Sequence, residues 1–105
     1  SARKRAREAL NIYVNRIVKY IGAYTAEMGG LDVLTFTAGI GENDIDLRRE
    51  VCQRLEPLGL LLDEEANGQR PRDAITISRK GSVVRVMVVP TNEELAIATQ
   101  AMTVV

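Results

Sequence analysis

Two short segments of the chain carry residue types that can bind a charged ligand. The first is Gly39–Asn43, which contains two glycines, and the second contains Glu93. Glycines let a ligand approach the backbone closely, and a helix that starts after such a turn points free N–H groups at an anion. A carboxylate can ligate a divalent cation. A nucleotide with its magnesium ion would suit the two segments together.

The first segment lies between a predicted strand and a predicted helix. Residues Leu31–Thr37 are rich in apolar and β-branched side chains, which favour a strand. Asn43 or Asp44 can cap the helix that follows, because a short side-chain oxygen can accept the free N–H groups of a first helical turn. This part of the chain is therefore predicted to form a strand, a glycine turn and a helix.

The second segment follows the most apolar stretch of the chain. Residues Val83–Val89 are apolar except for Arg85, and Pro90 ends the run. This pattern predicts a strand buried on both faces, as in the centre of a mostly parallel sheet flanked by helices. If both predicted strands are parallel, the two segments leave the same edge of the sheet, where α/β folds bind their ligands.

Helix capping separates Glu93 from its neighbour Glu94. A final helix is predicted from Thr91 through Met102. With Thr91 as N-cap, Glu94 occupies the third helical position, and its carboxylate can reach back to the Thr91 N–H. Glu93 lies one position outside this capping box, which makes it the metal-ligand candidate. The alternative is a solvated first-turn carboxylate favoured by the helix dipole.

Two further helices are predicted from apolar residues that recur every three or four positions. One covers Ala2–Met28 and ends at Gly29–Gly30; the other covers Ile45–Leu58. The apolar face of the first comprises Ala6, Leu10, Tyr13, Ile17, Ile21, Tyr24 and Met28. That of the second comprises Leu47, Val51, Leu55 and Leu58, with Arg48, Arg49, Glu50, Gln53 and Arg54 outside it.

The remaining segments indicate structural roles. Residues Ala74–Ser78 alternate in polarity, which predicts a short strand with one solvent-exposed face. Residues Asp63–Asp73 predict a surface loop or a single helical turn, whose carboxylates are more simply explained by solvation than by a metal. Cys52 lies beside an apolar stripe and is interpreted as a packing residue, because the chain has no histidine to activate a thiol.

Length and composition limit the possible classes of protein. The chain has 105 residues, 46% of them hydrophobic, which suffices for a single domain over residues 1–105. A formal net charge of zero favours neither nucleic acid nor an anionic membrane, and no apolar run approaches the ~20 residues of a membrane span. With one cysteine and no secretory signal, we expect a cytoplasmic protein.

Two common phosphate-binding motifs are absent from the sequence. A dinucleotide fingerprint that started at Gly39 would need a third glycine where the chain has Asp44. The Lys80–Ser82 run has the residue order Lys-Gly-Ser, which is not that of a P-loop, and it lies between two predicted strands. An oxidoreductase piece that binds a dinucleotide is therefore disfavoured.

Two longer runs of residues resemble signature segments of the acetate kinase family. They are Phe36-Thr37-Ala38-Gly39-Ile40-Gly41-Glu42-Asn43 and Val89-Pro90-Thr91-Asn92-Glu93-Glu94-Leu95. In that family both segments belong to the C-terminal part of the protein, and the resemblance extends from Leu10 to Ala98. It implies an α/β fold that is part of an actin-like, ribonuclease H-like ATPase domain.

The resemblance also implies an activity and a site. Acetate kinases transfer phosphate reversibly from ATP to a short-chain carboxylate, giving an acyl phosphate and ADP, and they form homodimers. Glu93 matches the family's magnesium-binding glutamate. The residues that match its nucleotide-binding loop are Gly39, Ile40, Gly41, Glu42 and Asn43.

The chain departs from the family in two respects. Asp44 stands where a small residue, commonly serine, is expected, and it adds a negative charge near a phosphate site. The family's acyl pocket and catalytic residues lie outside the resemblance, so no catalytic residue is assigned and the chain alone is expected to be inactive. A non-catalytic folding or dimerisation module is the alternative, and acetate, propionate and butyrate all remain possible substrates.

Overall fold

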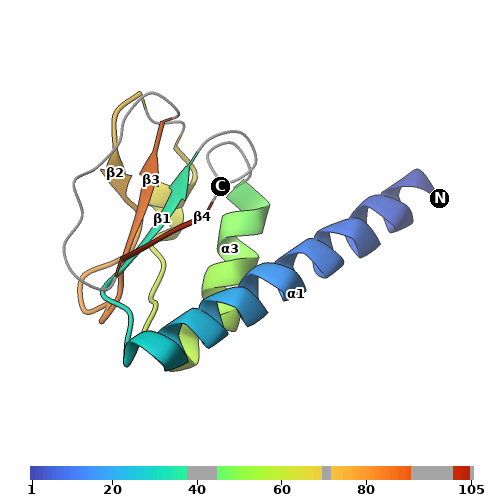
Figure 1. Ribbon diagram of the computed structural model, residues 1–105. Helices are drawn as coiled ribbons and strands as arrows, with labels where there is room; N and C mark the ends of the chain where they lie inside the picture. Colours follow the sequence, from blue (N-terminus) through green and yellow to red (C-terminus); the bar gives the residue numbers. More distant parts are fainter. Residues whose placement is uncertain (38–44, 70–71, 91–100, 105) are drawn as a thin grey trace.

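The computed structural model describes residues 1–37, 45–69, 72–90 and 101–104, the last four by their backbone only. A long helix projects from a small sheet packed on a second helix (Figure 1). In chain order the elements are α1 (Ala2–Met28), β1 (Val33–Thr37), α3 (Ile45–Arg54), the 3-10 turn η1 (Glu56–Leu58), α4 (Glu64–Asn67), β2 (Ile75–Thr76), β3 (Arg85–Val89) and β4 (Ala101–Val104).

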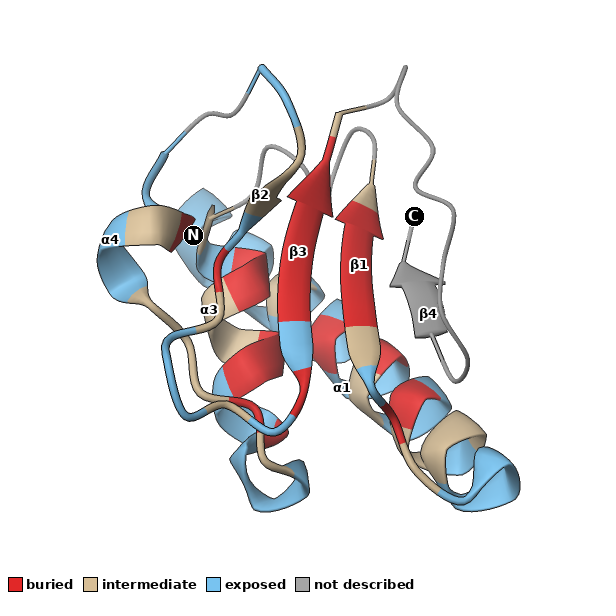
Figure 2. Ribbon diagram, turned by 90° about the vertical axis from the view of Figure 1, so that its left-hand side faces the viewer, coloured by how far each residue is buried: buried red, intermediate tan, exposed pale blue. Residues whose placement is uncertain are grey.

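The sheet is mostly parallel, as the apolar strand pattern predicted. Its strand order is β2-β3-β1-β4. Strand β1 runs parallel to both β3 and β4, whereas β2 pairs with β3 in the antiparallel direction. Figure 2 shows α1 and α3 together on one face of this sheet, so among the described residues the helices flank that face.

The core forms where β1 and β3 face the two helices. Alternate residues of a strand point to opposite faces, and Leu34 and Phe36 of β1 join Val86 and Val88 of β3 in one buried cluster with side chains of α1 and α3. The opposite face of β3 is also buried, since Val89 is only 1% exposed. The prediction of a strand buried on both faces is confirmed.

Helix α1 has the predicted bounds, and its predicted apolar face is buried at Ile17 and Ile21 but exposed at Ala6, Tyr13 and Met28. The predicted glycine stop is confirmed, because Gly29 adopts a left-handed conformation with φ of 77° and Gly30 N–H donates to Thr25 O at 3.0 Å. The buried residue is Val14, 1% exposed, and not the predicted Tyr13, 38% exposed. Val14 lies two helical turns before the buried Ile21 and about 20° from it round the helix, whereas Tyr13 lies about 80° from Ile21 and so points away from the sheet.

The second predicted helix is shorter than expected. Helix α3 ends at Arg54, and the chain continues as the 3-10 turn η1, which contains Pro57. A proline inside a helix removes a backbone hydrogen bond and clashes with the preceding turn, which accounts for the early end. Leu58 is 38% exposed and does not belong to the core.

The prediction of a final helix through Met102 is wrong at its end. Residues Ala101–Val104 form β4, in which Ala101 pairs with Val33 and Met102 pairs with Leu34. Without this strand, one edge of β1 would leave its backbone N–H and C=O groups without ladder partners. That long-range pairing outweighs the helical spacing of the local sequence; residues 91–100 lie outside the described ranges.

A glycine is required where the chain leaves η1. Gly59 has φ of 95°, and a Cβ atom placed on it would lie 2.7 Å from the Cβ of Val83. The Gly59 carbonyl also accepts the Val83 N–H at 2.8 Å, which joins the two segments. Both the left-handed backbone and the close approach exclude a larger residue here.

We predict that Gly59→Ala destabilises the fold by about 2–4 kcal/mol, because backbone strain and overpacking add. Gly81 has φ of 97°, but a Cβ atom added to it would meet no neighbour within 4 Å, so Gly81→Ala is the matched control for backbone strain alone. Urea denaturation of both variants measures the difference. Equal losses of unfolding free energy would show that the Val83 contact is unimportant.

Candidate functional site

The carboxyl ends of β1 and β3 lie side by side. Thr37, the last residue of β1, is in register with Val89, the last residue of β3. Neighbouring strands are spaced about 4.8 Å apart, so the two segments that follow start from adjacent points of one sheet edge. The expectation that both strand ends share an edge is confirmed.

The predicted ligand-binding residues themselves lie outside the described ranges. This holds for the whole Gly39–Asn43 segment, for Asp44 and for Glu93. What the structure places is their anchors: Thr37 before the glycine segment, Ile45 after it, and Pro90 before the segment that contains Glu93. Their roles as nucleotide and magnesium ligands therefore stay predictions.

The start of α3 contains a buried arginine that the apolar pattern of the sequence placed outside the stripe. Arg48 is 1% exposed, so that assignment is wrong. Its Nε donates to Asn67 Oδ1 at 2.7 Å, and its Nη2 donates to the Asn67 carbonyl at 2.9 Å. A guanidinium can be buried only if it is hydrogen-bonded. Asn67 of α4 supplies acceptors for Arg48 and so makes its burial possible.

One sequence signal could have identified this contact. Arg48 and the buried Cys52 are four positions apart and therefore share one side of α3, next to the stripe of Leu47 and Val51. A polar residue on a mostly buried side requires a partner, but the sequence does not indicate that Asn67 provides it. Only the packing of α4 on α3 brings these two side chains together.

Two carboxylates of the predicted loop, those of Asp63 and Glu64, have structural partners. Asp63 is the N-cap of α4, and its Oδ1 accepts the Ala66 N–H at 3.1 Å. Glu64 pairs with Arg49 at 2.9 Å, and the hydrogen bond from Arg49 to Glu64 is the main cause of the raised pKa of Arg49. Over the described part of the chain, no group of three or more histidine, cysteine, aspartate or glutamate residues is arranged to hold a metal ion.

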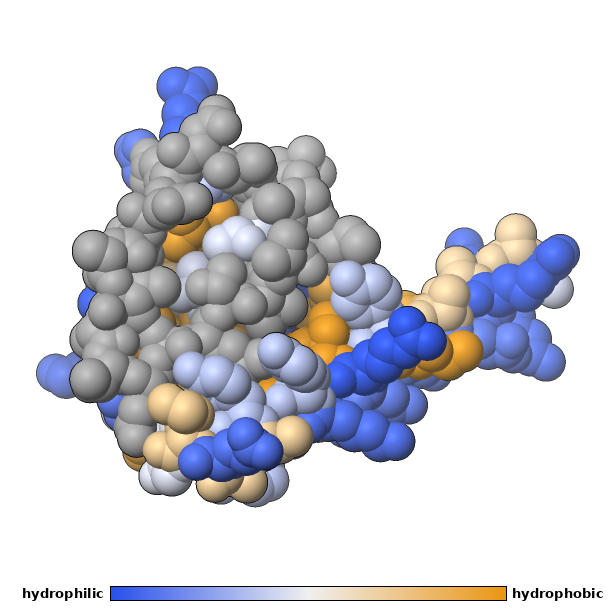
Figure 3. All heavy atoms as spheres, in the orientation of Figure 1, coloured by the Kyte–Doolittle hydropathy of each residue, from blue (hydrophilic) through white to orange (hydrophobic). Residues whose placement is uncertain are grey.

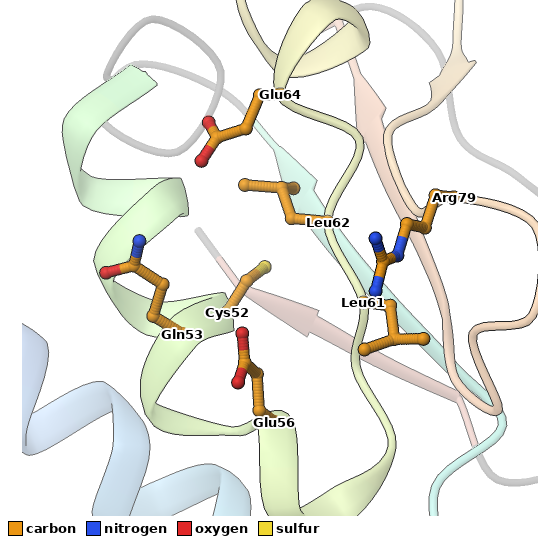
Figure 4. Close-up of a pocket in the computed structure, with 7 residues that line it drawn as sticks. All are labelled: Cys52, Gln53, Glu56, Leu61, Leu62, Glu64 and Arg79. Atoms are coloured by element: carbon orange, nitrogen blue, oxygen red, sulfur yellow. The ribbon is translucent and has the colours of Figure 1, made fainter.

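Cys52 lines a small pocket between α3 and the segment that leads into α4. The pocket has a volume of about 120 Å³, and Figure 4 shows Glu56, Glu64 and Arg79 around it. Burial raises the pKa of the Cys52 thiol to about 12; the charge of Arg48 opposes this shift and that of Glu64 adds to it. The thiol is therefore protonated at neutral pH, in agreement with its predicted packing role.

We predict that Cys52 resists alkylation by iodoacetamide at pH 8, because a thiol with a pKa of about 12 is thiolate in roughly one molecule in ten thousand. Unfolding in guanidinium should restore full labelling, which serves as the control. The folded state retains the thiol proton above the ordinary pKa of 9.0, so stability should fall as the pH rises beyond 9. Rapid labelling of the native protein, followed by mass spectrometry, would contradict this assignment.

Comparison with known proteins identifies the family of the chain. The family model described as the Acetokinase family matches residues 1–99. The chain belongs to this family. An acetate kinase from Leifsonia xyli is 58% identical over 97 residues, which are 92% of this chain and 24% of that protein.

Solved structures agree with this family assignment and with the α/β fold. The crystal structure of an acetate kinase from Porphyromonas gingivalis matches with a TM-score of 0.78 and 45% identity, over 85% of this chain and 22% of that one. That of a propionate kinase from Francisella tularensis matches with a TM-score of 0.71 and 35% identity, over the same shares of the two chains. The chain thus spans about a quarter of the length of these relatives.

Proposed function

We propose that the chain is the C-terminal nucleotide- and magnesium-binding portion of a short-chain carboxylate kinase with an actin-like fold. The reaction is reversible phosphate transfer from ATP to acetate, or to propionate or butyrate. Relatives of this family are named acetate kinases and, in one solved structure, a propionate kinase. We further propose a cytoplasmic homodimer as the working form of the whole protein.

The observation that carries the proposal is the register of β1 and β3. Because Thr37 lies beside Val89, the Gly39–Asn43 segment and the segment with Glu93 start from adjacent strand ends. Ligands of open α/β sheets bind outside the carboxyl ends of the strands. We propose that Gly39, Ile40, Gly41, Glu42 and Asn43 contact the nucleotide from one strand end and that Glu93 acts from the other.

The residues present fit a magnesium ion bound together with a nucleotide. Magnesium usually takes one or two carboxylates and fills its other positions with water and phosphate oxygens. The parallel register places the start of the Glu93 segment beside the start of the proposed nucleotide segment. Phosphate oxygens of a nucleotide bound there would fill further ligand positions, so one carboxylate suffices. Bound there, magnesium would neutralise charge on the transferred phosphoryl group, while the chain's own residues position the nucleotide.

Exposed apolar side chains on α1 favour a second candidate, a folding or dimerisation module. Ile12 is 59% exposed, Tyr20 is 66% exposed and Met28 is 46% exposed. Figure 3 shows α1 extending from the body of the molecule, with hydrophobic and hydrophilic residues mixed along it. A surface of this kind suits contact with another part of the kinase or with a second copy.

Calorimetric titration of the 105-residue chain with Mg-ADP separates the two candidates. A nucleotide site predicts heat at micromolar to millimolar ligand that Glu93→Ala abolishes. A silent titration together with concentration-dependent dimerisation would support the interaction module instead. In either case we expect no acyl phosphate from acetate and ATP, because the chain spans about a quarter of its relatives; turnover by the purified chain would refute this expectation.

In the full-length kinase, we predict that Glu93→Ala lowers magnesium-dependent activity by about 100-fold or more, since a charge-stabilising contact in the transition state is lost. Glu94→Ala is the matched control. It should reduce stability by about 0.5–2 kcal/mol through loss of the capping box and leave the magnesium dependence unchanged. Activity against magnesium concentration and thermal unfolding distinguish the two roles; equal stability losses with an unchanged magnesium dependence would refute the assignment of Glu93.

A further inference from the structure

Asn67 of α4 forms hydrogen bonds to α3 through both polar atoms of its side-chain amide. This side chain is 0% exposed, and its Oδ1 atom accepts from Arg48 Nε at 2.7 Å. Its other side-chain atom, Nδ2, donates to the carbonyl oxygen of Ile45 at 3.1 Å. The amide of Asn67 therefore connects Arg48 with Ile45, one helical turn apart on α3.

Ile45 is the first residue of α3, so this connection holds the start of the helix. Ile45 directly follows the 38–44 segment, and the buried residues Leu47 and Arg48 come shortly after it. A carbonyl oxygen has two lone pairs, and the Ile45 carbonyl can accept from Asn67 in addition to its own helix. Asn67 is therefore hydrogen-bonded to the residue that directly follows the 38–44 segment.

A second link between the same two helices lies at the surface. Arg49 Nε and Glu64 Oε1 are 2.9 Å apart, with side chains 36% and 56% exposed. Exposed ion pairs of this kind hold their partners weakly, because solvent and salt screen the charges. The buried Asn67 contacts are shielded from water, so they define the position of the α3 start more strictly than the surface pair does.

From this geometry we infer that Asn67 is a positioning residue for nucleotide binding, acting through the Ile45 carbonyl on the adjoining Gly39–Asn43 segment. The inference rests on the proposed function of that segment. A bound phosphate group depends on the direction of the backbone N–H groups at a helix start, and small displacements there weaken the contacts strongly. Arg48 supports this role by holding the amide of Asn67 in one orientation.

The substitution Asn67→Asp isolates the contact to Ile45. A carboxylate has the same shape and still accepts from Arg48, with a stronger, charge-assisted bond. It has no donor for the Ile45 carbonyl and places an oxygen against it. Glu64→Gln, which weakens the exposed pair with Arg49 and leaves the Asn67 contacts in place, is the matched control on the same helix pair.

Steady-state kinetics of the full-length kinase that contains this chain test the inference. We expect Asn67→Asp to raise the KM for ATP by about tenfold while the KM for the carboxylate changes by less than about twofold. Glu64→Gln should leave both values unchanged. If Asn67→Asp does not fold, Asn67→Ala removes the same donor without adding a second buried charge. It also removes the Oδ1 acceptor of Arg48, and it should change the KM for ATP in the same direction.

Each remaining result has a distinct meaning. An unchanged KM for ATP in a folded Asn67 variant would overturn the inference, as would a loss of kcat alone, which is what a smaller active fraction produces. An equal rise in KM from Glu64→Gln would also overturn it, because any weakening of the α3–α4 contact would then suffice. A wild-type kinase without nucleotide binding to the Gly39–Asn43 segment would overturn the proposed function and the inference with it.

Discussion

The parallel pairing of β1 with β3 is the contact on which the rest of the structure depends. Parallel strands cannot be joined by a tight hairpin, so the chain must cross over between them, and here the crossover contains α3, α4 and β2. This path packs α3 against the same face of the sheet as α1 (Figure 2). The same pairing puts the ends of both strands at one edge, which makes a shared site there geometrically possible.

Apolar packing and polar contacts have separate tasks in this fold. Burial of the strand residues against α1 and α3 supplies the main stabilisation, because hydrophobic burial is strong but not directional. The hydrogen bonds of Asn67 with Arg48 and Ile45 are directional, and they determine where α3 begins relative to α4.

The chain belongs to the Acetokinase family and is much shorter than the relatives that it matches. The chain spans about a quarter of the length of the relatives that it matches. None of the helices in the described ranges is long and apolar enough to span a membrane. The exposed apolar residues of α1 have the character of a protein contact surface.

Local sequence was sufficient wherever a short-range rule decides the structure. The spacing of apolar residues determined α1, and Gly29 determined its end, because left-handed backbone angles favour glycine. The continuous apolar run up to Val89 likewise predicted a strand buried on both faces. The family resemblance, carried by two motifs, was confirmed by the comparisons.

Contacts between distant segments decided the remainder. Ala101 has helical spacing with its neighbours, yet it pairs with β1 because an open strand edge gains a full ladder of hydrogen bonds. Arg48 is charged and was placed outside the apolar stripe, yet it is buried because Asn67, which lies far away in the sequence, provides acceptors for it. The sequence alone thus determined α1 with its glycine end, the buried strand β3 and the family. The tertiary structure decided which strand edges pair and which polar side chains are buried, since both depend on partners that no local pattern specifies.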